Sequence, residues 1–277
     1  MAARPDELRS LALVAISGVL FALQGSLLKL TLALGIGIFE AITVRGSVQL
    51  MGCMCIILCR AREHSAAVAL LGQPGHRRLL AARALIGYAG ISFNFAAIER
   101  LALGDAAAIS FLAPVISALL AWAFLAEAIR WHDTLAIAVA CAGIVLVARP
   151  PILFGAESAP DPIGVLFALA SALAVGNVVV LLRYLSQSVN WAVVLLYQAV
   201  GQVLISLPIA LALGRSWLVP PPAAIAYMLA SGSLAFGGQA CLINGLRRAR
   251  VGPASALRTT NVVASFVLQA SVSHAPV

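Results

Sequence analysis

The feature that most constrains this chain is a succession of apolar stretches, each long enough to cross a lipid bilayer. A membrane-spanning helix needs about 20 mostly apolar residues. Nine stretches of the sequence meet this requirement, at residues 10–32, 38–59, 79–98, 105–126, 131–148, 163–183, 191–213, 222–245 and 250–271. Only 10% of the 277 residues are charged, whereas soluble domains carry roughly 25%. We therefore expect an all-α, multi-pass membrane protein in which lipid is the solvent for most of the chain.

The basic residues between these stretches predict how the chain is oriented. With the N-terminus in the cytoplasm, the cytoplasmic segments carry eleven arginines and the opposite segments carry three. Lysine and arginine are enriched on the cytoplasmic side of membrane proteins. We therefore expect an integral membrane protein with a cytoplasmic N-terminus, and a plasma or inner membrane is favoured. The first apolar stretch is expected to stay in place as a signal anchor.

The sequence also argues against several function classes. The net charge of +8 is scattered singly and in pairs between apolar segments, so it predicts topology rather than a face that binds nucleic acid. The five cysteines all lie in apolar stretches, which favours packing over metal binding. The sequence contains no nucleophile–base pair, no metal-binding His–Glu motif and no phosphate-binding loop. We expect no enzymatic activity, no cofactor, no metal and no nucleic-acid partner.

The two halves of the chain resemble each other weakly. The segment "AAIERLALGDAAA" (96–108) aligns with "NGLRRARVGPASA" (244–256) at an offset of 148 residues, and "SGVLFALQGSLLK" (17–29) aligns with "SALAVGNVVVLLR" (171–183). The second alignment pairs Ser17 with Ser171 and Lys29 with Arg183. We predict two repeats, 1–150 and 151–277, separated by the proline-rich segment "ARPPILFGAESAPDP". Because a five-helix repeat is odd-numbered, the second copy enters the membrane from the opposite side, as in the inverted repeats of secondary transporters.

The order of these features resembles the drug/metabolite transporter superfamily, and within it the EamA-type transporters, which have ten helices in two five-helix repeats. The most specific segment is "ALGDAAAISFLAPVISALLAWAFLAEAIRWHDTLAIAVACAGIVLVARP" (102–150). Arg45 matches an arginine common in the second helix of that family, and "LRTTNVVASFVLQ" (257–269) is similar to the solute carrier family 35 group G branch. The resemblance implies a secondary transporter that moves a small organic metabolite by alternating access, with the substrate site between the repeats.

Two departures from the family pattern leave a second interpretation open. The second repeat holds only four of the expected helices, and "SHAPV" stands where a glutamate would end its last helix. A truncated or alternatively terminated gene product lacking a tenth helix is therefore expected. The alternative function is an inactive or regulatory membrane subunit without transport activity.

Two helices carry special faces that the repeat relates to each other. Arg258, Asn261, Ser265 and Gln269 recur every three or four residues and form a polar stripe on the helix expected at 250–271. The residues 148 positions earlier in the chain have small side chains. They include Ser117, on the helix that contains Pro114. Both stripes are expected to face inward, either across a central cavity or in close packing without a ligand. Pro114 predicts a helix kink, either at a cavity wall or purely structural.

Polar residues inside other helices complete the candidate site. Arg45 and Gln49 share one face of their helix, and Gln198, Gln202 and Ser206 share a face of another. An intramembrane arginine faces protein or water unless it snorkels to the interface. If arginines line a cavity, an anionic solute is favoured. The candidate substrate-binding residues are Gln24, Arg45, Gln49, Asn94, Ser117, Asn177, Gln198, Gln202, Asn244, Arg258 and Asn261.

The expected partners are a small-molecule solute and membrane lipid. The helix at 131–148 carries small residues, including Ala136 and Ala140, along its length. Small residues let helices approach closely, either within one chain or between two copies. These residues are therefore compatible with a homodimer as well as with packing inside one chain.

Overall fold

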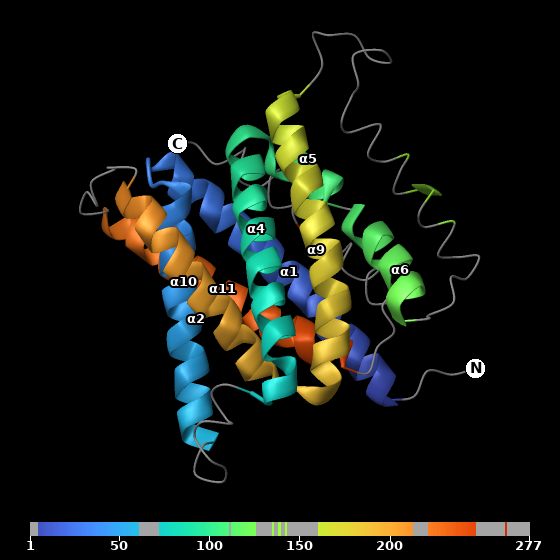
Figure 1. Ribbon diagram of the computed structural model, residues 1–277. Coiled ribbons are helices and arrows are strands. Elements are labelled where there is room, and N and C mark those ends of the chain that lie inside the picture. The colour runs from blue at the N-terminus through green and yellow to red at the C-terminus, as the bar shows by residue number, and fades with distance from the viewer. Residues whose placement is uncertain are drawn as a thin grey trace.

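The computed structural model describes residues 5–60, 72–110, 112–125, 160–212 and 221–247, with five isolated positions outside these ranges. Every element that it describes is helical (Figure 1). These helices are α1 (Pro5–Ala33), α2 (Ile38–Arg60), η2 (Pro74–His76), α4 (Arg77–Arg100), α5 (Leu103–Ile109), α6 (Leu112–Leu125), α9 (Pro162–Ser188), α10 (Trp191–Ala212) and α11 (Pro222–Leu246).

Six of the described helices are long and apolar enough to cross a membrane, and the apolar part of α6 is shorter. Large apolar side chains such as Met51, Phe124 and Leu204 are exposed, while the charged side chain of Arg83 is fully buried. This distribution is the reverse of that in a water-soluble protein. The prediction of an all-α, multi-pass membrane protein is therefore confirmed. The helices expected at 131–148 and 250–271 lie outside the described residues, so the count of nine stays a prediction.

The single helix expected over 105–126 is wrong, because this segment forms two helices. Helix α5 ends at Ile109, and α6 begins at Leu112. Pro114 has no N–H to donate to the carbonyl of Ser110, and its ring would clash with that carbonyl in a continuous helix. The chain instead turns at Ser110. Pro114 itself lies in the first turn of α6, where a missing N–H leaves no intrahelical hydrogen bond unmade.

The spanning helices pack in a defined set of neighbours (Figure 1). Helix α1 lies along α11, α4 along α9, and α2 along α10, while α2 also contacts α11 and α4 contacts α10. Helix α6 packs on the outside of α9. Glycines permit the closest approaches: a Cβ atom built on Gly176 of α9 would lie 2.6 Å from the Ile116 side chain of α6. Small residues at such crossings give membrane helices their packing contacts, because lipid supplies no hydrophobic drive.

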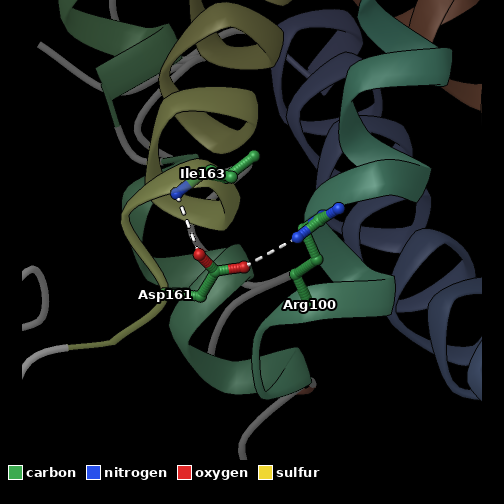
Figure 2. A network of polar contacts seen from close by, with 3 residues as sticks. All are labelled: Arg100, Asp161 and Ile163. Atoms are coloured by element: carbon green, nitrogen blue, oxygen red, sulfur yellow. Dashed lines mark hydrogen bonds and ion pairs between the residues drawn. The ribbon is translucent and has the colours of Figure 1, made fainter.

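A polar contact joins the end of α4 to the start of α9 (Figure 2). Asp161 caps α9 by accepting a 3.0 Å hydrogen bond from the backbone N–H of Ile163, and Pro162 occupies the first helical position. Its other carboxylate oxygen lies 3.1 Å from the Arg100 guanidinium. The Ile163 hydrogen bond, followed by the Arg100 contact, lowers the pKa of Asp161 below its ordinary value.

Candidate functional site

Three polar side chains form a line along α10. Gln198, Gln202 and Ser206 recur at intervals of four residues, so they lie above one another on one helix face. At 1.5 Å per residue this line is about 12 Å long. All three side chains are essentially inaccessible to solvent. The periodicity in the sequence therefore corresponds to a buried polar face in the centre of the bundle.

Helix α2 supplies polar side chains to the same region. Thr43 and Ser206 share a hydrogen bond of 2.8 Å between their hydroxyl oxygens, which ties α2 to the C-terminal half of α10. Arg45 and Gln49 follow on α2, four residues apart, and both are buried. Because the first turns of α2 meet the last turns of α10, the two helices are antiparallel.

Helix α4 adds Arg83, which sequence reasoning did not include among the candidate site residues. This side chain is fully buried, and its Nη1 donates a hydrogen bond to Oε1 of Gln198. We call the set Thr43, Arg45, Gln49, Arg83, Gln198, Gln202 and Ser206 the polar seam. The signal for Arg83 was present in the sequence, because an ionisable residue within a spanning helix is a candidate functional residue by default.

The two arginines of the polar seam each lie near the N-terminal end of a helix, Arg45 in α2 and Arg83 in α4. The Arg45 guanidinium lies 5.8 Å from the centre of the Phe95 ring, and Phe95 is in the last two turns of α4. Arg83 is in the first two turns of α4. Among the residues that the structure describes, the one salt bridge is the Arg100–Asp161 pair. Neither seam arginine therefore has a carboxylate partner within that part of the chain.

Much of the hydrogen-bonding capacity of the polar seam is unused. Both amide atoms of Gln49 and of Gln202 are buried without a partner, and so are Nε of Arg45 and Nε and Nη2 of Arg83. A buried polar group without a partner costs roughly 1–3 kcal/mol. Most buried polar groups in proteins are satisfied. In the described part of the chain, several buried donors and acceptors without partners therefore lie together in the polar seam.

The other candidate residues divide into three groups. Gln24 is buried in α1, and Asn94 is half-buried in α4. Ser117 donates to the carbonyl of Pro114 in its own helix at 2.9 Å. Asn177 and Asn244 each donate to the carbonyl four residues earlier in their own helices. Arg258 and Asn261, with the rest of their predicted stripe, lie outside the described residues.

Within the described ranges, no three His, Cys, Asp or Glu side chains come together in a way that could hold a metal ion. The chemistry available in the polar seam is therefore that of guanidinium, amide and hydroxyl groups. These groups bind and orient a polar molecule through hydrogen bonds and charge.

A bundle of membrane-spanning helices with charged and amide side chains buried at its centre defines a multi-pass membrane protein with a polar interior. The chain belongs to the EamA-like transporter family, which it matches over residues 8–149 and 162–277. The resemblance to EamA-type transporters is thus confirmed, and the family is one of membrane transporters rather than enzymes.

Individual relatives are similar over parts of the chain. Solute carrier family 35 member G1 from Homo sapiens is 28% identical over 207 residues, which cover 72% of this chain and 56% of the relative. A probable transporter, vicT, from Bipolaris victoriae is 32% identical over 112 residues, covering 40% of this chain and 30% of the relative. The chain spans about half the length of the solute carrier family 35 member G1 proteins from Homo sapiens and Mus musculus.

A solved crystal structure shares the fold. It superposes with a TM-score of 0.67 at 19% sequence identity, covering 95% of this chain and 89% of the other. Identity at this level supports the helix arrangement alone.

Proposed function

We propose that this chain is a secondary transporter that moves a small organic metabolite across a membrane by alternating access, with the solute bound in the polar seam between two inverted repeats. The observation that carries this proposal is the set of buried amide and guanidinium groups without partners where α2, α4 and α10 meet. Ionisable side chains inside membrane-spanning segments mark substrate or ion pathways by default.

The helix contacts support the two repeats. If the second repeat starts at α9, then α1 corresponds to α9, α2 to α10 and α4 to α11. Exchanging the members of each pair converts the α1–α11 contact into α9–α4, and the α2–α11 contact into α10–α4. All four contacts are present. The α2–α10 contact converts into itself, so the pseudo-twofold axis of the proposed repeats passes between these two helices.

Individual residues follow the same exchange. Gly90 of α4 packs against Ala174 and Val175 of α9, and Gly238 of α11 packs against Phe21 of α1. Gly238 is the counterpart of Gly90 at the offset of 148 residues. Phe21 is the counterpart of Val175 in the alignment of 17–29 with 171–183. Corresponding glycines therefore meet corresponding partners, which a duplication explains.

A pair of basic residues gives the same pattern at the helix ends. Lys29 donates to the carbonyl of Leu101 just after α4. Its counterpart Arg183 donates to the carbonyls of Leu246 and Arg247 at the end of α11. A cation at a helix C-terminus interacts favourably with the unpaired carbonyls and the helix dipole. Because inverted repeats place equivalent residues at opposite ends of the bundle, the proposal assigns these two caps to opposite membrane surfaces.

In repeat-built transporters the substrate site lies near the bilayer midplane, where the repeats meet. The proposal assigns the polar seam to this place, because the seam follows the α2–α10 contact. The Thr43–Ser206 hydrogen bond stands toward one end of the seam, and the Arg83–Gln198 hydrogen bond toward the other. Opening the two ends in alternation would expose the middle of the seam to each side of the membrane in turn.

The test is transport by the purified chain in lipid vesicles preloaded with a pooled metabolite extract, measured as counterflow. We expect at least one solute to exchange, and we expect Gln202→Leu to reduce its exchange strongly. Asn177→Ala is the control, because the Asn177 amide donates to the carbonyl of Leu173 in its own helix. If the folded native chain moves no solute, the inactive or regulatory membrane subunit becomes the better interpretation.

A further inference from the structure

The polar seam holds two positive charges for which the described part of the chain provides no negative partner. Arg45 is 5% exposed and Arg83 is fully buried. The acidic side chains that the structure describes are Glu40, Glu99, Asp105 and Asp161. Glu40 accepts from the backbone of Gly37, and Asp161 pairs with Arg100. The seam arginines form no salt bridge with any of the four.

We propose that Arg45 and Arg83 bind the oxyanion group of the solute, a carboxylate or a phosphate, so that the substrates of this chain are organic anions. That the bound anion is also transported rests on the proposed function. The anion site itself is measurable without transport.

The geometry brings the two arginines toward one region. Arg45 lies over Phe95 near the C-terminal end of α4, and Arg83 starts from the N-terminal end of the same helix. A Cβ atom built on Gly87 would lie 3.7 Å from Nη1 of Arg83. The Arg83 side chain therefore runs along α4 toward the middle of the bundle, one turn beyond its own backbone. Gln198, which accepts from Arg83, is one turn of α10 away from Gln202, and Gly46 next to Arg45 packs against Gln202.

A purely structural role does not explain this arrangement. Replacing buried charges by apolar groups of similar size is often neutral or stabilising, even when the charges are paired. A buried charge without a partner is less favourable still. The ring of Phe95 offsets part of the cost for Arg45 alone. An anionic ligand offsets the cost for both arginines.

The donors that remain available match an oxyanion. A guanidinium presents its N–H groups in a planar fork that complements carboxylate and phosphate oxygens. Arg83 uses Nη1 on Gln198 and keeps Nε and Nη2 without partners, and Nε of Arg45 is also without one. The unpartnered amides of Gln49 and Gln202 supply donors and acceptors for other polar groups of the solute.

The experiment uses the full chain in lipid vesicles and a metabolite extract separated by charge into anionic, neutral and cationic fractions. Two readouts are taken for each fraction: the thermal unfolding temperature and counterflow. A ligand that binds only the folded state raises the unfolding temperature. We expect the anionic fraction to raise it and to support counterflow, and the other two fractions to do neither. Phosphatase treatment of the anionic fraction then separates the two sources, since loss of the effect identifies a phosphate ester and persistence identifies a carboxylate.

Variants of the two arginines test the assignment. Arg83→Gln and Arg45→Gln should each require about tenfold or more anion for the same response. Their unliganded unfolding temperature should equal or exceed that of the native chain, because an unpaired buried charge has been removed. Arg83→Lys should fall in between, since it keeps the charge but loses the fork. Arg78→Gln is the matched control, because Arg78 is an exposed arginine in the same helix.

The outcomes for this inference and for the proposed function are distinct. A response of the native chain to the neutral or cationic fraction, with counterflow, would overturn the anion site and leave transport standing. Stabilisation by the anionic fraction without any counterflow would overturn transport and leave the anion site standing. An anion response that is unchanged in Arg83→Gln would overturn the role of this residue. If a glutamine variant does not fold, the comparison of fractions on the native chain decides the matter.

Discussion

Gly46 of α2 lies against Gln202 of α10 so closely that a Cβ atom built on the glycine would be 2.9 Å from the Gln202 Cβ and 3.4 Å from the carbonyl oxygen of Ala199. The contact is between a backbone and the stem of a polar seam residue. The position of the Gln202 amide therefore depends on the absence of a side chain at residue 46. This relationship couples the packing of α2 and α10 to the geometry of the seam.

Gly46→Ala should destabilise the protein, because the added methyl group forces the two helices apart. Overpacking of this kind costs roughly 1–3 kcal/mol. Gly201→Ala is the matched control in α10, since its new Cβ would meet only the Cβ of Ala84, at an ordinary contact distance of 3.6 Å. Thermal unfolding of both variants in the same detergent measures the difference. Equal unfolding temperatures for the two variants would show that the α2–α10 approach is looser than described.

The Thr43–Ser206 hydrogen bond should contribute a measurable coupling free energy between α2 and α10. Interhelical hydrogen bonds in membrane proteins average about 0.6 kcal/mol in double-mutant cycles, with a maximum near 1.7. The cycle consists of Thr43→Val, Ser206→Ala and the double variant, each followed by reversible unfolding. Strictly additive effects of the two single changes would mean that the hydroxyls contribute independently.

The parts of the site that follow from helical periodicity were predictable from the sequence. Gln198, Gln202 and Ser206 interrupt an otherwise apolar segment every four residues, and such a pattern has a single interpretation once the segment is a helix. The structure places all three in a buried line. Periodicity gives the face of a helix but not its neighbour, so the contact with α2 required the structure.

For other residues of the candidate site, the sequence allows two arrangements of the side chain or helix, and the structure is needed to choose between them. Arg83 lies close to the start of its predicted helix, where snorkelling to the interface is a normal alternative to burial. Asn177 lies near the middle of α9 and Asn244 near the C-terminal end of α11. In either place an amide can bind a solute or donate to the carbonyl four residues earlier. The structure shows the second option for both asparagines. Pro114 predicts an interruption, but the choice between a kink and a new helix depends on how α6 packs against α9.

Acidification should weaken the contact between α4 and α9 through Asp161. Its pKa is lowered in the folded state, first by the Ile163 N–H and then by Arg100. The contribution to stability is therefore fully present above the ordinary pKa of 3.8 and is lost as the pH falls through the lower folded value. The Asp161→Asn variant keeps an oxygen acceptor for the Ile163 N–H. The difference in unfolding temperature between this variant and the native protein should therefore shrink as the pH falls. A difference between the two proteins that grows on acidification would contradict this assignment.

Single cysteines at two helix ends should become labelled from opposite sides of the membrane. Leu34 follows α1 and is exposed, and Ser188 is exposed at the end of α9. In a background without the five native cysteines, we expect Leu34→Cys to react with an impermeant maleimide from outside the cell and Ser188→Cys to react only after the membrane is opened. The expectation depends on five crossings between the two positions: α2, α4, the α5–α6 segment, the helix predicted at 131–148, and α9. Labelling of both cysteines from the same side would mean an even number of crossings, and the second repeat would then not be inverted relative to the first.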